Sequence, residues 1–104
     1  MERTIKPEDF AAIANTVMVL DVRRTEDRDA SSEAIDGAIW KDPTQIEQWV
    51  SALPHEQPVI LYCVRGGSVS NSVVDRLLTN GVQARFIVGG IEGWKAAGGK
   101  VVSK

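Results

Sequence analysis

The strongest constraint on the fold of this chain is the alternation of short apolar runs with segments of helical pattern. Three runs, at residues 17–22, 58–62 and 84–88, are almost continuously apolar. Runs of this length are typical of strands that are covered on both faces, as in a parallel sheet. Strands that alternate with helices form βαβ units. The sequence therefore predicts an α/β fold with a mostly parallel central sheet and helices on both of its faces.

The segments between these runs complete the expected order of elements. Residues 23–36 are mostly charged or small, which indicates a surface loop with one helical turn. A short tail follows Gly98 and Gly99. A chain of 104 residues fits one domain, so we expect a single domain over residues 1–104. Helices are expected at residues 6–16, 42–52, 69–80 and 91–97, and a further short strand at 37–40.

The composition excludes several classes of protein. Twelve Lys and Arg against 14 Asp and Glu give a net charge of −2, which argues against nucleic-acid binding through a basic field. With 43% hydrophobic and 25% charged residues the chain is typical of globular proteins. Residues 1–5 lack the apolar run of a signal peptide, and no stretch approaches the roughly 20 apolar residues of a membrane span. We expect a soluble, cytoplasmic protein with no nucleic-acid or membrane partner; the oligomeric state is not indicated.

Cysteine and histidine usage narrows the chemistry further. Cys63 is the one cysteine and His55 the one histidine of the chain. An intramolecular disulfide is therefore impossible, and a zinc site built from cysteine and histidine is excluded. We expect no metal and no cofactor, a reduced environment, and a surface position for His55.

The segment around Cys63 is the most informative part of the chain. Cys63 ends an apolar strand, and the loop 64–68 leads into a helix. Loop amides and the free amides of the helix can converge above the sulfur, and Gly66 and Gly67 allow the positive φ values of a curled loop. The helix N-terminus and Arg65 add positive charge, which favours the thiolate. Such a cradle suits an anion on Cys63, for example a persulfide, although the loop alone does not distinguish sulfur, phosphate and arsenate chemistry.

Three stretches of the sequence resemble a single-domain rhodanese of the rhodanese-like superfamily. They are 19–23 (Val-Leu-Asp-Val-Arg), 35–39 (Ile-Asp-Gly-Ala-Ile) and 59–98, which contains Cys63 and the Gly-Gly-Ile-Glu-Gly-Trp signature at 89–94. The resemblance covers about the whole chain. It implies a rhodanese-like three-layer α/β/α fold with a mostly parallel sheet of about five strands.

The resemblance also implies an activity, that of a thiosulfate sulfurtransferase. The Cys63 thiolate would take the outer sulfur of a small anionic donor such as thiosulfate and pass it, as a persulfide, to a thiol, cyanide or protein acceptor. By the same resemblance Arg65 would attract the donor, Ser68 would hydrogen-bond the sulfur, and Asp21 and Arg23 would hold neighbouring loops. The substrate cradle would be formed by the amides of Val64, Arg65, Gly66, Gly67, Ser68 and Val69.

The sequence departs from the family pattern in four places. Ser68 stands where many members have arginine, and Ala34 stands where histidine is frequent. The loop 23–35 is about two residues longer, and Val69 precedes Ser70 where a small residue often follows the loop directly. These differences bear on the identity of the donor and on turnover more than on the role of Cys63.

Two alternative functions stay open. A cysteine phosphatase or arsenate reductase is disfavoured, because a Cys-x₅-Arg loop would need arginine where the chain has Val69, and because the chain has no second cysteine to act as a resolving thiol. A rhodanese-like sulfur carrier or partner-binding module without multiple turnover would also use Cys63, so the sequence does not separate it from an enzyme. A lone cysteine after an apolar strand is also often a small buried core residue.

Overall fold

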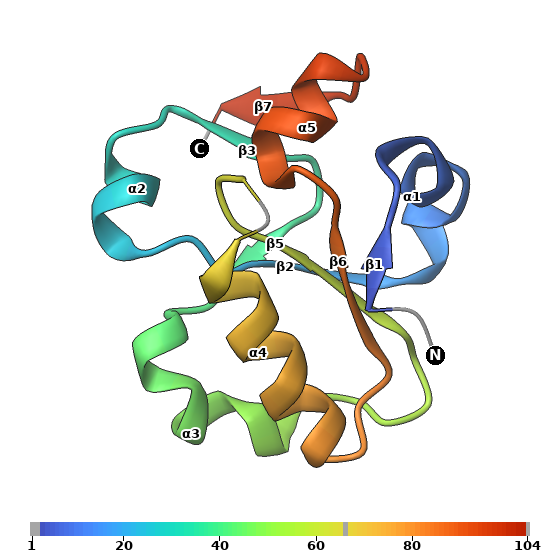
Figure 1. Cartoon of the computed structure of the whole chain (residues 1–104), viewed down its shortest axis with the longest axis vertical. Coiled ribbons are helices and arrows are strands. Elements are labelled where there is room, and N and C mark those ends of the chain that lie inside the picture. Colours follow the sequence, from blue (N-terminus) through green and yellow to red (C-terminus); the bar gives the residue numbers. More distant parts are fainter. Residues whose placement is uncertain (1–2, 66, 104) are drawn as a thin grey trace.

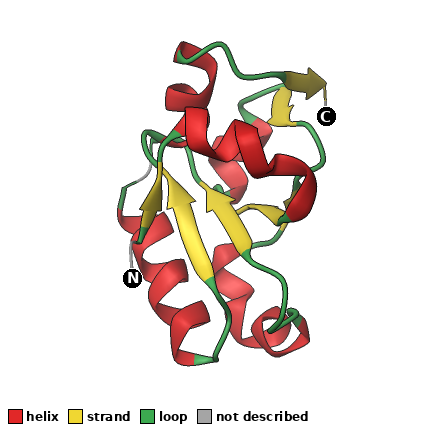
Figure 2. Cartoon of the chain, turned by 90° about the vertical axis from the view of Figure 1, so that its right-hand side faces the viewer, coloured by secondary structure: helices red, strands yellow, loops and turns green. Residues whose placement is uncertain are grey.

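The sheet at the centre of the protein is parallel, as predicted. The structure is a computed structural model that describes residues 3–65 and 67–103. Figure 2 shows the central strands running in the same direction. In the order in which they pair, the five strands are β1 (Thr4–Ile5), β6 (Ala84–Ile87), β5 (Val59–Tyr62), β2 (Met18–Asp21) and β4 (Ile39–Trp40).

Helices lie on both faces of this sheet. In Figure 1, α3 and α4 lie together below the strands, and α1 lies on another side of the molecule. No helix within residues 3–65 and 67–103 is long and apolar enough to cross a bilayer. The helices are α1 (Pro7–Ile13), α2 (Thr25–Asp29), α3 (Ile46–Trp49), α4 (Ser68–Thr79) and α5 (Gly90–Ala96), with 3₁₀ turns η1 (Ala14–Thr16), η2 (Pro43–Gln45) and η3 (Val50–Ala52).

Two hydrophobic layers, one on each face of the sheet, explain the continuous apolar runs. Leu61 packs in the layer with the residues of α3 and α4, whereas Ile60 and Tyr62 pack in the layer with those of α1 and α5. Side chains alternate between the faces of a strand, so each position in β5 is buried on one side or the other. The predicted α/β fold with a sheet of about five strands is confirmed.

Two parts of the chain differ from the prediction. The loop and tail contain β3 (Glu33–Ile35) and β7 (Val101–Ser103), which pair antiparallel in a separate two-stranded sheet. The helix expected over 42–52 is divided into η2, α3 and η3. At its start, the side chain of Asp42 accepts hydrogen bonds from the backbone N and the Oγ of Thr44, at 2.9 and 2.7 Å. This local bonding favours a tight turn over a regular first helical turn.

The sheet brings the segments that follow β2 and β5 to one edge. Asp21 at the end of β2 is in register with Tyr62 at the end of β5. Because the strands are parallel, the segments that follow them emerge side by side. The loop that contains Cys63 and the segment that leads into α2 therefore lie at the same edge, where ligands of parallel sheets bind.

Candidate active site

Cys63 follows directly after β5 and opens onto a pocket at the carboxyl edge of the sheet. Its side chain is largely buried, with 6% of its surface exposed, yet it contributes to the wall of a pocket of about 370 Å³. Cys63 is therefore held by the core and also lines an open pocket. The pocket is lined by Arg24, Asp27, Cys63, Val64, Arg65, Gly67, Ser68 and Val69.

The structure brings the predicted cradle residues together around this pocket. Val64, Arg65, Gly67, Ser68 and Val69 all line it with Cys63, whereas the remaining predicted residue, at position 66, lies outside the described residues. Gly67 is the N-cap of α4 and the next two residues begin the helix. Amides in the first turn of a helix have no partner within it. Among the described residues, those of Ser68 and Val69 donate to no backbone carbonyl.

A side-chain donor that the sequence analysis did not identify also reaches the sulfur. The Oγ of Ser70 donates a hydrogen bond to the Sγ of Cys63 at 3.0 Å, and Ser70 is fully buried. Ser70 occupies the same helical stripe as Val73, Val74 and Leu77, which are core residues. A serine on the apolar stripe of a helix needs a hydrogen-bond partner, and this pattern could have identified it.

The glycine requirement of the loop differs from the prediction. Gly67 has a φ of −94°, so the expectation of a positive φ there is wrong, and a side chain at this position would meet open space. The glycine that the loop does need is Gly90, at the start of α5. It has a φ of +62°, and a Cβ there would overlap with the carbonyl oxygens of Cys63 and Val64. The absence of a side chain at Gly90 therefore lets α5 approach the cysteine loop closely.

Helix α5 fixes the orientation of the first peptides of the loop. The backbone N–H of Ile91 donates to the carbonyl of Cys63 at 3.0 Å, and that of Glu92 donates to Val64 at 3.2 Å. In a trans peptide the carbonyl and the following N–H point in opposite directions. The N–H groups of Val64 and Arg65 therefore point away from α5.

Beside the cysteine loop, a buried ion pair joins the end of β2 to β3. Arg23 donates from Nε and Nη2 to both carboxylate oxygens of Asp21, at 2.7 to 3.0 Å, and from Nη2 to the carbonyl of Glu33 at 2.9 Å. Burial acts to lower the pKa of Arg23, but the hydrogen bond to Asp21 and its charge outweigh this effect and raise the pKa. With these contacts Arg23 holds the loop rather than facing the pocket.

These features define a class of protein, namely parallel α/β proteins in which a loop that begins with a cysteine joins a central strand to a helix. Within the described residues no group of three or more His, Cys, Asp or Glu side chains could hold a metal ion. The sequence model of the rhodanese-like domain matches residues 6–97. The chain belongs to the rhodanese-like family.

Comparisons with individual proteins agree with this assignment. The thiosulfate sulfurtransferase GlpE of Coxiella burnetii is 32% identical over 82 residues, which are 77% of this chain and 73% of that protein. The crystal structure of a rhodanese-related protein from Thermoplasma volcanium has a TM-score of 0.87 and 24% identity, covering 98% of this chain and 99% of that one. The match to the rhodanese-like family and the similarity to GlpE place the chain among sulfurtransferase-type proteins.

A third comparison bears on the phosphatase alternative. The structure of a Rhodopseudomonas palustris protein described as a possible tyrosine phosphatase has a TM-score of 0.83 and 20% identity, covering 97% of this chain and 85% of that one. At this identity the likeness shows a shared fold alone. It does not favour phosphatase chemistry for this chain.

Proposed function

We propose that the protein is a thiosulfate-type sulfurtransferase in which Cys63 carries the transferred sulfur. The observation that carries the proposal is the position of Cys63: its sulfur receives a hydrogen bond from Ser70, and the residue lines a pocket together with Ser68 and Val69, whose amides donate to no backbone carbonyl among the described residues. Hydrogen-bond donors around a sulfur stabilise its anion. A cytoplasmic, reducing location suits a protein whose one cysteine must stay a thiol.

The reaction has two steps that balance without a redox partner. The thiolate of Cys63 attacks the outer sulfur of thiosulfate, the sulfur–sulfur bond of the donor breaks, and sulfite leaves with the bonding pair. The persulfide formed on Cys63 is then attacked at its outer sulfur by cyanide or a thiolate, and the Cys63 thiolate leaves. The donor is thus a small dianion, and the acceptor is a nucleophile.

The backbone geometry supports an anion-binding role for the loop. Because α5 binds the carbonyls of Cys63 and Val64, the amides of Val64 and Arg65 point away from that helix, and among the described residues they donate to no backbone carbonyl. Together with the amides of Ser68 and Val69 they provide donors for the outer sulfur of a persulfide. Oriented amides need no reorganisation when negative charge develops on that sulfur.

Two cations near the pocket favour an anionic donor. Arg24 and Arg65 are exposed, line the pocket and form no ion pair within residues 3–65 and 67–103. Asp27 lines the same pocket and partly offsets this charge. The net positive charge attracts thiosulfate, while the position that a phosphatase would need for its arginine is Val69, which also lines the pocket.

The mass of the intact protein after treatment with thiosulfate tests the proposal. The expected result is a gain of one sulfur atom at Cys63, which cyanide removes with release of thiocyanate. Cys63→Ser should show neither event, because serine keeps the volume but provides no thiolate. An unchanged mass of the wild-type protein, or sulfur transfer by Cys63→Ser, would contradict the proposal. Repeated turnover in the same assay distinguishes an enzyme from a carrier, which would release one equivalent.

A further inference from the structure

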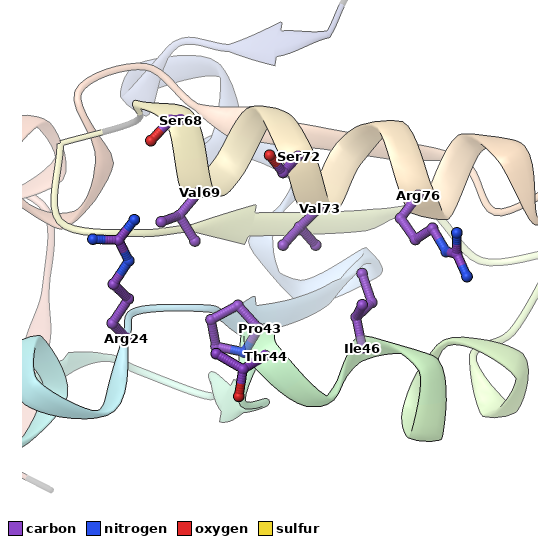
Figure 3. A pocket seen from close by; sticks show the side chains of 9 residues that line it. All are labelled: Arg24, Pro43, Thr44, Ile46, Ser68, Val69, Ser72, Val73 and Arg76. Carbon is purple, nitrogen blue, oxygen red and sulfur yellow. The ribbon is translucent and has the colours of Figure 1, made fainter.

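A second cavity adjoins the Cys63 pocket. This groove, of about 300 Å³, lies between α4 and the segment 43–46, and its lining is shown in Figure 3. Arg24, Ser68 and Val69 line both the groove and the Cys63 pocket, so the two cavities meet at these residues. A molecule in the groove would therefore have one end at the Cys63 pocket.

The walls of the groove are mainly apolar. Val69 and Val73 point from α4 toward Pro43 and Ile46 on the opposite side (Figure 3). The two valines are four residues apart and therefore lie on one face of the helix. From Ser68 to Arg76 the groove follows α4 over about 12 Å. Its size falls at the lower end of the range for small-molecule sites. The groove therefore suits a slender, largely uncharged chain.

The two ends of the groove differ in charge. Arg24, at the junction with the Cys63 pocket, forms no ion pair or side-chain hydrogen bond with the described residues. Arg76, at the far end, is paired with Glu47. The free positive charge of the groove therefore lies at the end next to the sulfur. Asp27 borders the Cys63 pocket but does not line the groove. An anionic group of a ligand would be favoured close to its reacting atom rather than at its far end.

We infer that this groove is the acceptor subsite and that the acceptor is a small thiol with a carboxylate near its sulfur and an apolar body. The inference rests on the proposed function of Cys63. The acceptor's thiolate attacks the outer sulfur of the Cys63 persulfide, one sulfur–sulfur bond forms and one breaks, and the Cys63 thiolate leaves. The product is the persulfide of the acceptor. Thiosulfate needs the Cys63 pocket alone, whereas the body of the acceptor occupies the groove.

Single-turnover transfer from protein that thiosulfate has already converted to the persulfide tests this inference. The probes are 2-mercaptohexanoate, mercaptoacetate, which has the same thiol and carboxylate without the alkyl tail, and uncharged 2-mercaptoethanol. The wild-type protein should transfer sulfur to 2-mercaptohexanoate about tenfold faster than to mercaptoacetate, because the tail is buried in the groove. Arg24→Gln should slow transfer to both carboxylates more than it slows transfer to 2-mercaptoethanol.

A variant that fills the groove provides the sharper test. Ser72 is exposed on α4 and lines the groove, so Ser72→Phe should remove the advantage of 2-mercaptohexanoate. Thr79→Phe, an exposed position of the same helix outside the groove, is the matched control and should keep that advantage.

The outcomes separate this inference from the proposed function. Failure of thiosulfate to load Cys63 would refute the proposed function itself. Normal loading and normal transfer to cyanide, combined with equal rates for the two carboxylates or with no effect of Ser72→Phe, would refute the acceptor groove alone. Fast transfer to a reduced protein dithiol that is insensitive to Ser72→Phe would equally overturn it, because the acceptor would then be a macromolecule that does not use the groove.

Discussion

Ser70 donates a hydrogen bond from its hydroxyl to the sulfur of Cys63 at 3.0 Å, and both side chains are buried. Because Ser70 is in the first turn of α4, the bond also ties the helix to the end of β5. A hydrogen bond to a charged group is worth about 1.5 to 3 kcal/mol, and about 1.4 kcal/mol corresponds to a tenfold effect.

We therefore predict that Ser70→Ala lowers the rate of sulfur transfer by about tenfold or more. The variant also removes a hydrogen-bond donor from the reacting sulfur, so alkylation of Cys63 by iodoacetamide at neutral pH should slow as well. Circular dichroism checks that the fold is kept. If the variant is folded, reacts with iodoacetamide at the wild-type rate and transfers sulfur normally, the Ser70 hydroxyl has a role in packing and none in sulfur transfer.

Arg65 is exposed at the mouth of the Cys63 pocket, and its expected effect is on binding of the donor. Arg65→Ala should raise the KM for thiosulfate about two- to fivefold and change kcat little, as is typical of an exposed charge. The effect should shrink as salt is added, because exposed charges are screened. Lys6→Ala removes a cation outside the pocket and is the matched control. Equal KM values for Arg65→Ala and Lys6→Ala would show that Arg65 does not contribute to binding of the donor.

Alanine substitutions at Gly67, which belongs to the cysteine loop, and at Gly90, which packs against it from α5, should have different effects on stability and activity. Gly90→Ala should distort the loop and strongly reduce both stability and sulfur transfer, because its Cβ would overlap with the carbonyls of Cys63 and Val64. Gly67→Ala adds a Cβ into open space at a negative φ and should leave the unfolding free energy within about 1 kcal/mol of wild type. Urea unfolding and the thiosulfate assay measure both effects. Similar losses in the two variants would contradict this view of the loop.

The main sheet could be predicted from the sequence because its central strands have a local signature. Each residue of β5 packs into one of two hydrophobic layers, which produces a continuous apolar run. The pair formed by β3 and β7 has no such signature. Glu33–Ile35 and Val101–Ser103 are short, partly exposed and far apart in the sequence, so their pairing depends on the arrangement of the rest of the fold.

The candidate site was predictable only in its central segment. The order of strand, cysteine, loop and helix is enough to place Cys63 at the sheet edge. Arg24 reaches the same pocket from a loop distant in the sequence, and only the parallel pairing of β2 with β5 brings it there. A glycine in the sequence likewise does not reveal its own φ, so the negative φ of Gly67 could not be predicted. The need for glycine at position 90 depends on the packing of α5 against the cysteine loop, which only the fold shows.

Tyr62 gives the protein a defined response to alkaline pH. Burial, followed by the nearby charge of Asp21, raises the pKa of Tyr62 well above its ordinary value, and its hydroxyl accepts a hydrogen bond from the N–H of Ile35 at 3.2 Å. The folded state thus keeps the phenol neutral while the unfolded chain ionises it above a pH of about 10. The contribution of Tyr62 to stability is present below that pH and is lost as the pH rises toward the folded-state pKa.

Tyrosinate absorbance tests this directly, because Tyr62 is the one tyrosine of the chain. At about one pH unit above its ordinary pKa, the folded protein should show little tyrosinate, and urea unfolding at the same pH should produce it. Tyr62→Phe should lower the unfolding free energy by about 1 to 3 kcal/mol at neutral pH, because the N–H of Ile35 loses its acceptor. Ready ionisation of Tyr62 in the folded protein would contradict the assignment.

The ion pair of Asp21 and Arg23 should contribute through the position of the loop and not through the reaction. Both side chains are buried, so Asp21→Asn leaves the Arg23 charge without its counter-ion and should cost about 3 to 5 kcal/mol of unfolding free energy. Asp75→Asn is the matched control, because its pair with Arg3 is exposed and should contribute less than about 1 kcal/mol. At a temperature where Asp21→Asn is still folded, Cys63 should still gain sulfur from thiosulfate. If a fully folded Asp21→Asn protein no longer gains sulfur from thiosulfate, the pair of Asp21 and Arg23 takes part in the reaction itself.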